Sequence, residues 1–243
     1  MRWSDCGGRG NAIRSPRVGL EVRLGAFTVV DAYPEGASPP AERVVEVVRL
    51  AEEVEAAGLE SLWVAEHHFH LDGVCPSPPV LLAACGVRTS RIRLGSRVGV
   101  LPFHPPVDLA EQYALLDRLI GGRLNLGVGS GYLASEFAGF GLDPADKRAR
   151  FDASLALRRD AFAGREIRPG GPTAPPVRLN VTPVQQPGPP IWIAVQRREA
   201  IAHVAAMVGA VVLARGVNDE ALSDEILQAV RAHLTDTGKA MSP

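Results

Sequence analysis

The chain has 243 residues, of which 46% are hydrophobic, 22% charged and 5% aromatic, a composition typical of one large soluble globular domain. Its formal net charge of −1 provides no field that would attract nucleic acid or an acidic membrane surface, so neither partner is expected. The longest apolar run, Val204 to Ala214, is too short to span a bilayer, and three cysteines in no metal or redox spacing (Cys6, Cys75 and Cys85) suit a reducing cytoplasm.

Strands and helices are expected to alternate along the chain. Residues 1–21 are rich in arginine and glycine without an apolar stretch, which predicts a disordered leader and not a secretory signal, followed by one domain over 22–243. Apolar runs predict six strands: Val22–Val30, Ser61–Ala65, Ile92–Leu101, Arg123–Gly129, Ile191–Val195 and Val211–Ala214. Apolar residues on one helical face predict the helices: Glu42–Ala57, Val80–Val87, one opened by Pro105-Pro106, Lys147–Phe162, Glu199–Val208 and one capped by Asn218 or Asp219.

Two segments interrupt this alternation. Residues 130–143 are expected to form a glycine-rich loop, and residues 164–190, which hold eight prolines, are expected to be an excursion and not a barrel element. Elsewhere the alternation predicts parallel strands with helices outside, an α/β fold of the TIM-type (β/α) barrel kind. About six βα units are expected, two fewer than in a closed eight-stranded barrel.

A cluster of titratable residues, Glu66-His67-His68-Phe69-His70, directly follows the second expected strand. The carboxyl ends of parallel strands form the edge at which α/β proteins do chemistry. Because consecutive side chains of a strand point to opposite faces, only one of His67 and His68 can face this edge. An imidazole titrates near neutral pH and suits a general base, whereas a histidine bonded to a loop carbonyl is the structural alternative.

The same histidines permit a metal-dependent hydrolase. His68 and His70 form an H-x-H pair whose alternate side chains would share one face and could chelate zinc. His104 could add a ligand, but His203 and His233 fall in expected helices, and no strand-end lysine or aspartate completes the set. The sequence therefore predicts no metal site, and a metal-dependent hydrolase stays open as the least favoured alternative.

Three motifs occur together: Trp63–Phe69, Val100-Leu101-Pro102 before the proline-started helix, and Asp117–Gly131. In their order and spacing the chain resembles the bacterial-luciferase-like family of flavin-dependent monooxygenases, from about Arg23 to the end. The Glu-His-His-Phe version is similar to the FMN branch more than to the deazaflavin-using branch. The resemblance implies an eight-stranded barrel that is here shortened at its C-terminus, because family members usually continue for roughly two more βα units.

The resemblance also implies a function. Family members take reduced FMN from a separate reductase and use O₂ on a small organic substrate, usually as dimers, so a homodimer or a heterodimer with a family member is expected in the cytoplasm. His67 would be the catalytic base, and Glu66 would lie near the flavin edge or orient a neighbour. His70 is expected at the surface. The alternative is a shortened member without turnover that binds flavin or supports an active partner.

The glycine run is the second expected site. Gly127, Gly129 and Gly131 recur at period two, so they lie on one face of an extended segment and let another group approach the backbone. That group is a flavin ring or phosphate, or else a neighbouring strand in tight barrel packing. Ser130 and Tyr132 would add a hydroxyl group and backbone donors.

Three arginines are candidates for the FMN phosphate. Arg148 aligns with a family arginine that pairs with this phosphate, and a solvated helix charge is the alternative. After the fifth expected strand the family commonly has small residues that clasp the phosphate at a helix N-terminus. Here Gln196-Arg197-Arg198 stands in their place, and the two arginines would either bind the phosphate or crowd it out.

Overall fold

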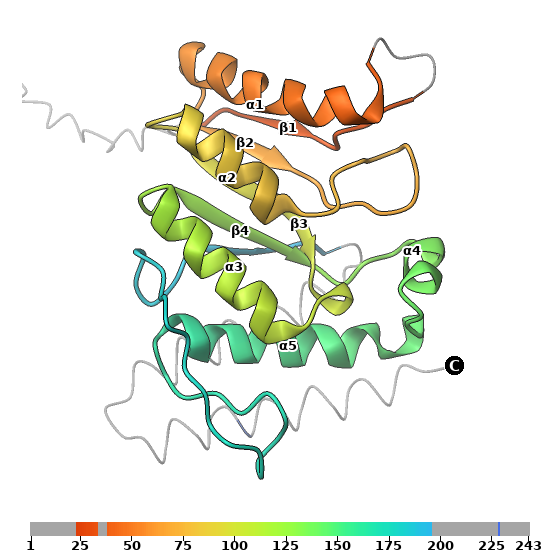
Figure 1. Cartoon of the computed structure of the whole chain (residues 1–243), viewed down its shortest axis with the longest axis vertical. Coiled ribbons are helices and arrows are strands. Elements are labelled where there is room, and N and C mark those ends of the chain that lie inside the picture. Colours follow the sequence, from red (N-terminus) through yellow and green to blue (C-terminus); the bar gives the residue numbers. More distant parts are fainter. Residues whose placement is uncertain (1–22, 34–37, 196–227, 229–243) are drawn as a thin grey trace, which may run out of the picture.

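The computed structural model describes residues 23–33, 38–195 and 228 (Figure 1). Within them lie five strands: β1 (Gly25–Thr28), β2 (Ser61–Val64), β3 (Arg93–Val100), β4 (Leu124–Gly129) and β5 (Ile191–Ile193). The helices are α1 (Pro40–Ala56), α2 (Pro78–Arg88), α3 (Pro106–Leu119), α4 (Ala134–Gly139) and α5 (Lys147–Phe162), with 3₁₀ turns η1 (Leu101–Phe103) and η2 (Pro144–Asp146). No helix in these residues is both long and apolar enough to cross a membrane.

The strands form one sheet in the order β1-β2-β3-β4-β5, and every neighbouring pair is parallel. The predicted α/β fold with parallel strands is therefore confirmed. The expected leader, the sixth expected strand and the helices after Glu199 lie outside the described residues, and so does any closure of the sheet into a barrel.

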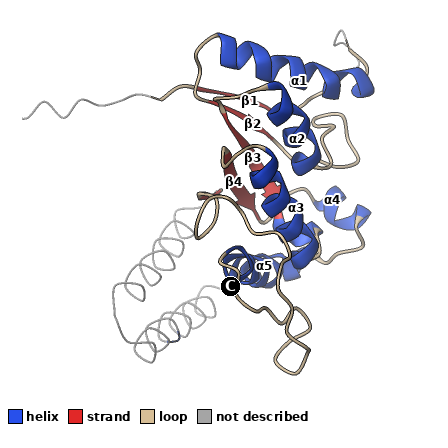
Figure 2. Cartoon of the chain, turned by 60° about the vertical axis from the view of Figure 1, so that its left-hand side comes forward, coloured by secondary structure: helices blue, strands red, loops and turns tan. Residues whose placement is uncertain are grey.

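Helices α1, α2 and α3 cover one face of the sheet, as both views show (Figures 1 and 2). Leu62 and Val64 of β2 both point to this side, because alternate residues of a strand share a face. The helical layer covers them, and both are fully buried. Trp63 lies on the other face, where its ring meets Trp192 of β5 edge-on with the ring centroids 5.8 Å apart. The core therefore lies between the sheet and its helical layer.

The parallel arrangement brings the carboxyl ends of the strands to one edge of the sheet. The pairing of β3 with β4 shifts register between Ser96 and Gly99, and the bulge contains a cis peptide bond between Arg97 and Val98. The carbonyl of Val98 in this bulge accepts the Glu66 N–H at 3.3 Å. The bulge thus fastens the chain after β2 to β3.

Helix α4 is the main difference from the predicted elements, since it falls inside the expected glycine-rich loop. It has only six residues, ends in glycine and has no side-chain N-cap, so no periodicity or capping signal marks it. The excursion over 164–190 carries only an isolated antiparallel bridge between Ile167 and Val177 in the described structure, as expected. Other boundaries differ by a few residues, and α2 begins at Pro78 because proline is tolerated in the first helical turn.

Candidate functional site

The segment after β2 leaves the strand and folds back along it. The N–H of His67 donates to the carbonyl of Cys75 at 3.1 Å, and the N–H of Val74 donates to Val30 at 2.9 Å. Phe69 has a φ of 65°, a left-handed conformation that is uncommon for a residue with a side chain. This residue ends the strand-like alternation, so the residues before and after it enter two separate clusters.

The first cluster is centred on Glu66, whose side chain is 1% exposed. The imidazoles of His68 and His104 donate to its Oε1 through Nε2 at 3.0 and 2.6 Å, and the Val100 N–H donates to Oε2 at 2.9 Å. Burial alone would raise the pKa of the Glu66 carboxyl group. The hydrogen bonds from His104, His68 and Val100, with the charge of His104, outweigh burial and lower this pKa below its ordinary value. Glu66 is therefore ionised and orients both histidines.

His68 is held by aromatic rings as well as by Glu66. Its ring meets Phe140 edge-on at a centroid distance of 4.7 Å and Phe103 at 5.7 Å, and Phe103 and Phe140 stack on each other at 4.9 Å. Phe69 presses on Gly139 of α4, where a side chain would overlap its ring. His68 is thus packed inside the fold, on the opposite side from His67.

A buried cation, Arg158, interacts electrostatically with this cluster. Arg158 of α5 is fully buried, and its Nη2 donates to Ser154 Oγ at 3.3 Å. Burial lowers the pKa of the Arg158 guanidinium to about 10, while electrostatic interactions with Tyr113 and Glu66 act to raise it. The attraction between Arg158 and Glu66 helps to balance the buried carboxylate.

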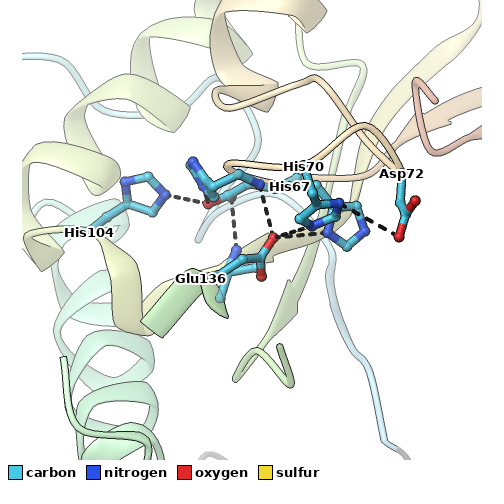
Figure 3. A network of polar contacts seen from close by, with 8 residues as sticks. His67, His70, Asp72, His104 and Glu136 are labelled. Carbon is cyan, nitrogen blue, oxygen red and sulfur yellow. Dashed lines mark hydrogen bonds and ion pairs between the residues drawn. The ribbon is translucent and has the colours of Figure 1, made fainter. Parts of the chain in front are cut away.

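The second cluster joins His67 and His70 to Glu136 of α4 (Figure 3). A single oxygen, Glu136 Oε1, accepts the backbone N–H of His68 at 2.9 Å and lies 3.1 Å from His67 Nδ1 and 3.2 Å from His70 Nε2. The Glu136 side chain is only 2% exposed, whereas those of His67 and His70 are 13% and 21% exposed. Glu136 therefore fixes the orientation of His67 from a helix 69 residues away in the sequence.

Gly73 and Tyr132 flank His67. A Cβ at position 73 would lie 2.6 Å from His67 Cδ2, so the Gly73 backbone packs directly on the imidazole and leaves no room for a side chain. The ring of Tyr132, which is 60% exposed, stands perpendicular to the His67 ring at a centroid distance of 6.3 Å. Within the described residues, no hydrogen bond reaches the other ring nitrogen of His67, Nε2.

The glycine run serves strand packing in its first part. A Cβ at Gly127 would overlap the Ser96 carbonyl of β3, and one at Gly129 would lie 2.5 Å from Val98 Cγ2. Gly131 adopts a φ of +76°, and a Cβ there would meet Val100 and Phe137 at 3.0 and 3.1 Å. The close approach at Gly127 and Gly129 is thus made by β3, which was one of the two expected explanations.

The structure brings some of the candidate residues together and leaves others apart. The rings of His67 and Tyr132 are in contact. Glu66 precedes His67 in the sequence, and its side chain contacts His68 and His104 in the first cluster. Arg148, on the exposed side of α5, forms its ion pair with Asp152 one turn along, at 2.8 Å. Gln196, Arg197 and Arg198 lie outside the described residues.

Two expectations are wrong. His70 is partly buried and not a free surface residue, because it packs against His67 and contacts Glu136. The H-x-H pair does not share a face, since His68 joins Glu66 and His70 joins Glu136 on either side of the left-handed Phe69. The sequence reasoning also missed Glu136, for which the only available signal was a carboxylate beside a phenylalanine shortly after the glycine run.

Comparisons with known proteins agree with this site. Residues 22–243 match the luciferase-like monooxygenase family model. The 4-hydroxyprotoasukamycin monooxygenase of Streptomyces nodosus subsp. asukaensis is 43% identical over 119 residues, which are 49% of this chain and 32% of that protein. The first three curated relatives are matched over 43%, 62% and 32% of their own length, so the chain spans less than two thirds of each.

Two solved structures resemble the chain. The monooxygenase RslO1 from Streptomyces bottropensis has a TM-score of 0.70 and 27% identity, over 88% of this chain and 67% of that one. The oxygenating constituent of 3,6-diketocamphane monooxygenase from Pseudomonas putida, solved with FMN, has a TM-score of 0.65 at 16% identity, over 77% and 55% of the two chains. The second likeness is one of fold.

Proposed function

Because the chain belongs to the luciferase-like monooxygenase family, we propose that it acts as the oxygenase of a system that uses reduced FMN and O₂ on a small organic substrate. The observation that carries this proposal is the placement of His67. Glu136 holds one of its ring nitrogens, Gly73 packs on its ring, and Tyr132 stands beside it at the carboxyl edge of the sheet.

The residues at the end of β4 fit a flavin mononucleotide. No hydrogen bond within the described residues engages the backbone N–H groups of Ser130, Gly131 and Tyr132, which leaves three consecutive donors and a hydroxyl group for an anionic ligand. Tyr132 offers an exposed aromatic face to a planar ring. We assign these residues, together with Gly129 and Glu66, to the cofactor site, and we assign Arg148, Arg197 and Arg198 to binding of the phosphate group.

His67 is the proposed base. Bound reduced FMN supplies the electrons that O₂ requires, and the protein has to position groups and move protons. An oxygen of the Glu136 carboxylate accepts the Nδ1–H of His67, so this proton stays on Nδ1 and the lone pair of Nε2 is available. Nε2 can then take a proton from substrate or cofactor, while the packed His68 keeps a structural role.

The partners follow from the same proposal. One relative, from Acinetobacter baylyi, is named as the oxygenase component of a flavin-dependent trigonelline monooxygenase, and a component of this kind needs a reductase. We propose that this chain is likewise an oxygenase component that works with a separate reductase, in the cytoplasm.

Apolar side chains are exposed on helices α2 and α3, which supports a homodimer or a heterodimer with a family member. They are Val80 (69% exposed), Val87 (72%), Leu115 (49%) and Leu119 (58%). A monomer in sedimentation at micromolar concentration would contradict the dimer.

An anaerobic titration tests the cofactor. Reduced FMN and reduced F420 are added separately to the protein, because another relative, from Rhodococcus jostii, is named an F420-dependent glucose-6-phosphate dehydrogenase. Saturable binding of FMN and a weaker response to F420 are expected. Preference for F420 would refute the FMN assignment, and absence of binding to either would favour the non-catalytic, partner-supporting alternative.

A further inference from the structure

The cluster of His67, His70 and Glu136 has a property that the oxygenation chemistry does not use. It brings two imidazole nitrogens and one carboxylate oxygen to a single point (Figure 3). We propose that this cluster is a binding site for a divalent transition-metal ion of the zinc type, and that the bound ion inhibits the oxygenase. The inhibition rests on the proposed function, whereas the binding does not.

The distances match those of a metal site. Glu136 Oε1 lies 3.1 Å from His67 Nδ1 and 3.2 Å from His70 Nε2, and all three atoms are within 4.8 Å of one another. In a tetrahedral zinc site with bonds of about 2.1 Å, neighbouring ligand atoms are roughly 3.4 Å apart and the ring centroids of two histidines roughly 5 Å apart. The centroids of His67 and His70 are 5.1 Å apart, so small side-chain adjustments suffice.

The ligand chemistry suits zinc-like ions more than magnesium or calcium. Imidazole nitrogens bind borderline transition metals, whereas magnesium and calcium prefer all-oxygen sites. Three protein ligands leave a fourth position for water or another small ligand. Two imidazoles already converge on one oxygen of Glu136, and a cation between them would bond both imidazoles and that oxygen.

His70 also has an outer partner of the expected kind. Its Nδ1 is buried and has no hydrogen bond within the described residues, and Asp72 Oδ2 lies 3.8 Å away. When Nε2 binds a metal, Nδ1 carries the remaining proton. A carboxylate next to that proton forms the carboxylate–histidine–metal arrangement that orients histidine ligands.

The neighbouring cluster of Glu66, His68 and His104 also holds three metal-ligating atoms, but it is a poorer site. The His68 ring is enclosed by Phe103 and Phe140, and the Glu66 oxygens are engaged by two imidazoles and the Val100 N–H. The His67 cluster, with imidazoles that are 13% and 21% exposed, can be reached by an ion from solvent.

Zinc titration by calorimetry tests the binding. After removal of metals by a chelator, the wild-type protein should bind one zinc ion. His70→Ala should weaken binding at least about tenfold, because it removes a ligand. His104→Ala, matched in residue type and located in the other cluster, should bind zinc as wild type does. Absence of zinc binding by wild type, unchanged affinity in His70→Ala, or loss in His104→Ala would each overturn the assignment.

Cobalt provides a readout that does not depend on the variants. Co²⁺ at this site should give the visible absorption of a low-coordinate nitrogen and oxygen environment, and Zn²⁺ should displace it. Thermal melting shows whether each variant is folded at the assay temperature. A Co²⁺ spectrum typical of six water ligands would overturn the site.

Flavin-dependent turnover tests the inhibition separately. A zinc ion on His67 Nδ1 displaces the proton that Glu136 accepts and withdraws charge from the ring, so zinc should inhibit wild type but not His70→Ala. Full turnover with zinc bound would overturn the inhibition, as would oxygen uptake that requires Fe²⁺ and no flavin. Zinc binding by a protein that has no flavin activity would refute the proposed oxygenase and retain the metal site.

Discussion

Replacing Gly73 by alanine should displace the proposed catalytic base. A Cβ at this position would lie 2.6 Å from His67 Cδ2 and 2.7 Å from His67 Cβ. Since carbon atoms pack at roughly 3.5–4.0 Å, the imidazole or the loop has to move by about 1 Å. Overpacking of this kind costs about 1–3 kcal/mol of stability, and a misplacement of about 1 Å can cost about 100-fold in rate.

The control is Gly86→Ala, the same substitution at a buried glycine of α2. A side chain there would overlap Ile120, so stability should fall while the site is untouched. Turnover with reduced FMN is compared at a temperature where both variants are folded, as judged by their melting curves. Gly73→Ala should lose about 100-fold and Gly86→Ala little. Equal losses in the two variants, or full activity in Gly73→Ala, would refute the idea that packing on His67 sets the rate.

Three further predictions concern charge. Arg148→Ala should weaken FMN binding by about 1.5–3 kcal/mol and leave riboflavin binding unchanged, so equal losses for both flavins would assign Arg148 to the fold. The pKa of Glu66 is lowered, so its contribution to stability is present above pH 4.5 and is lost as the pH falls below that value. The free energy of unfolding in urea should therefore fall less between pH 7 and 3 in Glu66→Gln than in wild type. Backbone N–H groups of Ile92, Arg91 and Ser90 lower the pKa of Glu55 to about 2 despite the opposing effect of burial. Glu55→Gln should therefore reduce the melting temperature at pH 7, and the difference in melting temperature from wild type should disappear between pH 4.5 and 2.

Local patterns predicted much of the fold because they act over short distances. Helix α5 begins at Lys147 and ends at Phe162 as expected, and the predicted divergence of His67 and His68 is confirmed by their separate partners. Alternation failed at Phe69, because a left-handed residue with a side chain has no sequence signal comparable to glycine.

The rest of the site depends on contacts between distant segments. Glu136 contacts His67, His68 and His70, which precede it in the chain by 69, 68 and 66 positions. His104 contacts Glu66, which precedes it by 38 positions. Neither contact leaves a periodic pattern. The glycine spacing predicted a place of close approach, but the neighbour at Gly127 and Gly129, strand β3, is set by the pairing of distant strands.

The most direct test of the central claim is the coupling of oxygen to product in His67→Ala, with His68→Ala as the matched control. The substrate is a small organic compound that wild type oxygenates with reduced FMN. His67→Ala should bind reduced FMN as wild type does, lower product formation by about 10² to 10⁴ and release hydrogen peroxide instead. His68→Ala should mainly lose stability, because its ring is packed against Glu66 and the phenylalanines. Full coupling in His67→Ala, or uncoupling caused by the loss of His68 instead, would contradict the account.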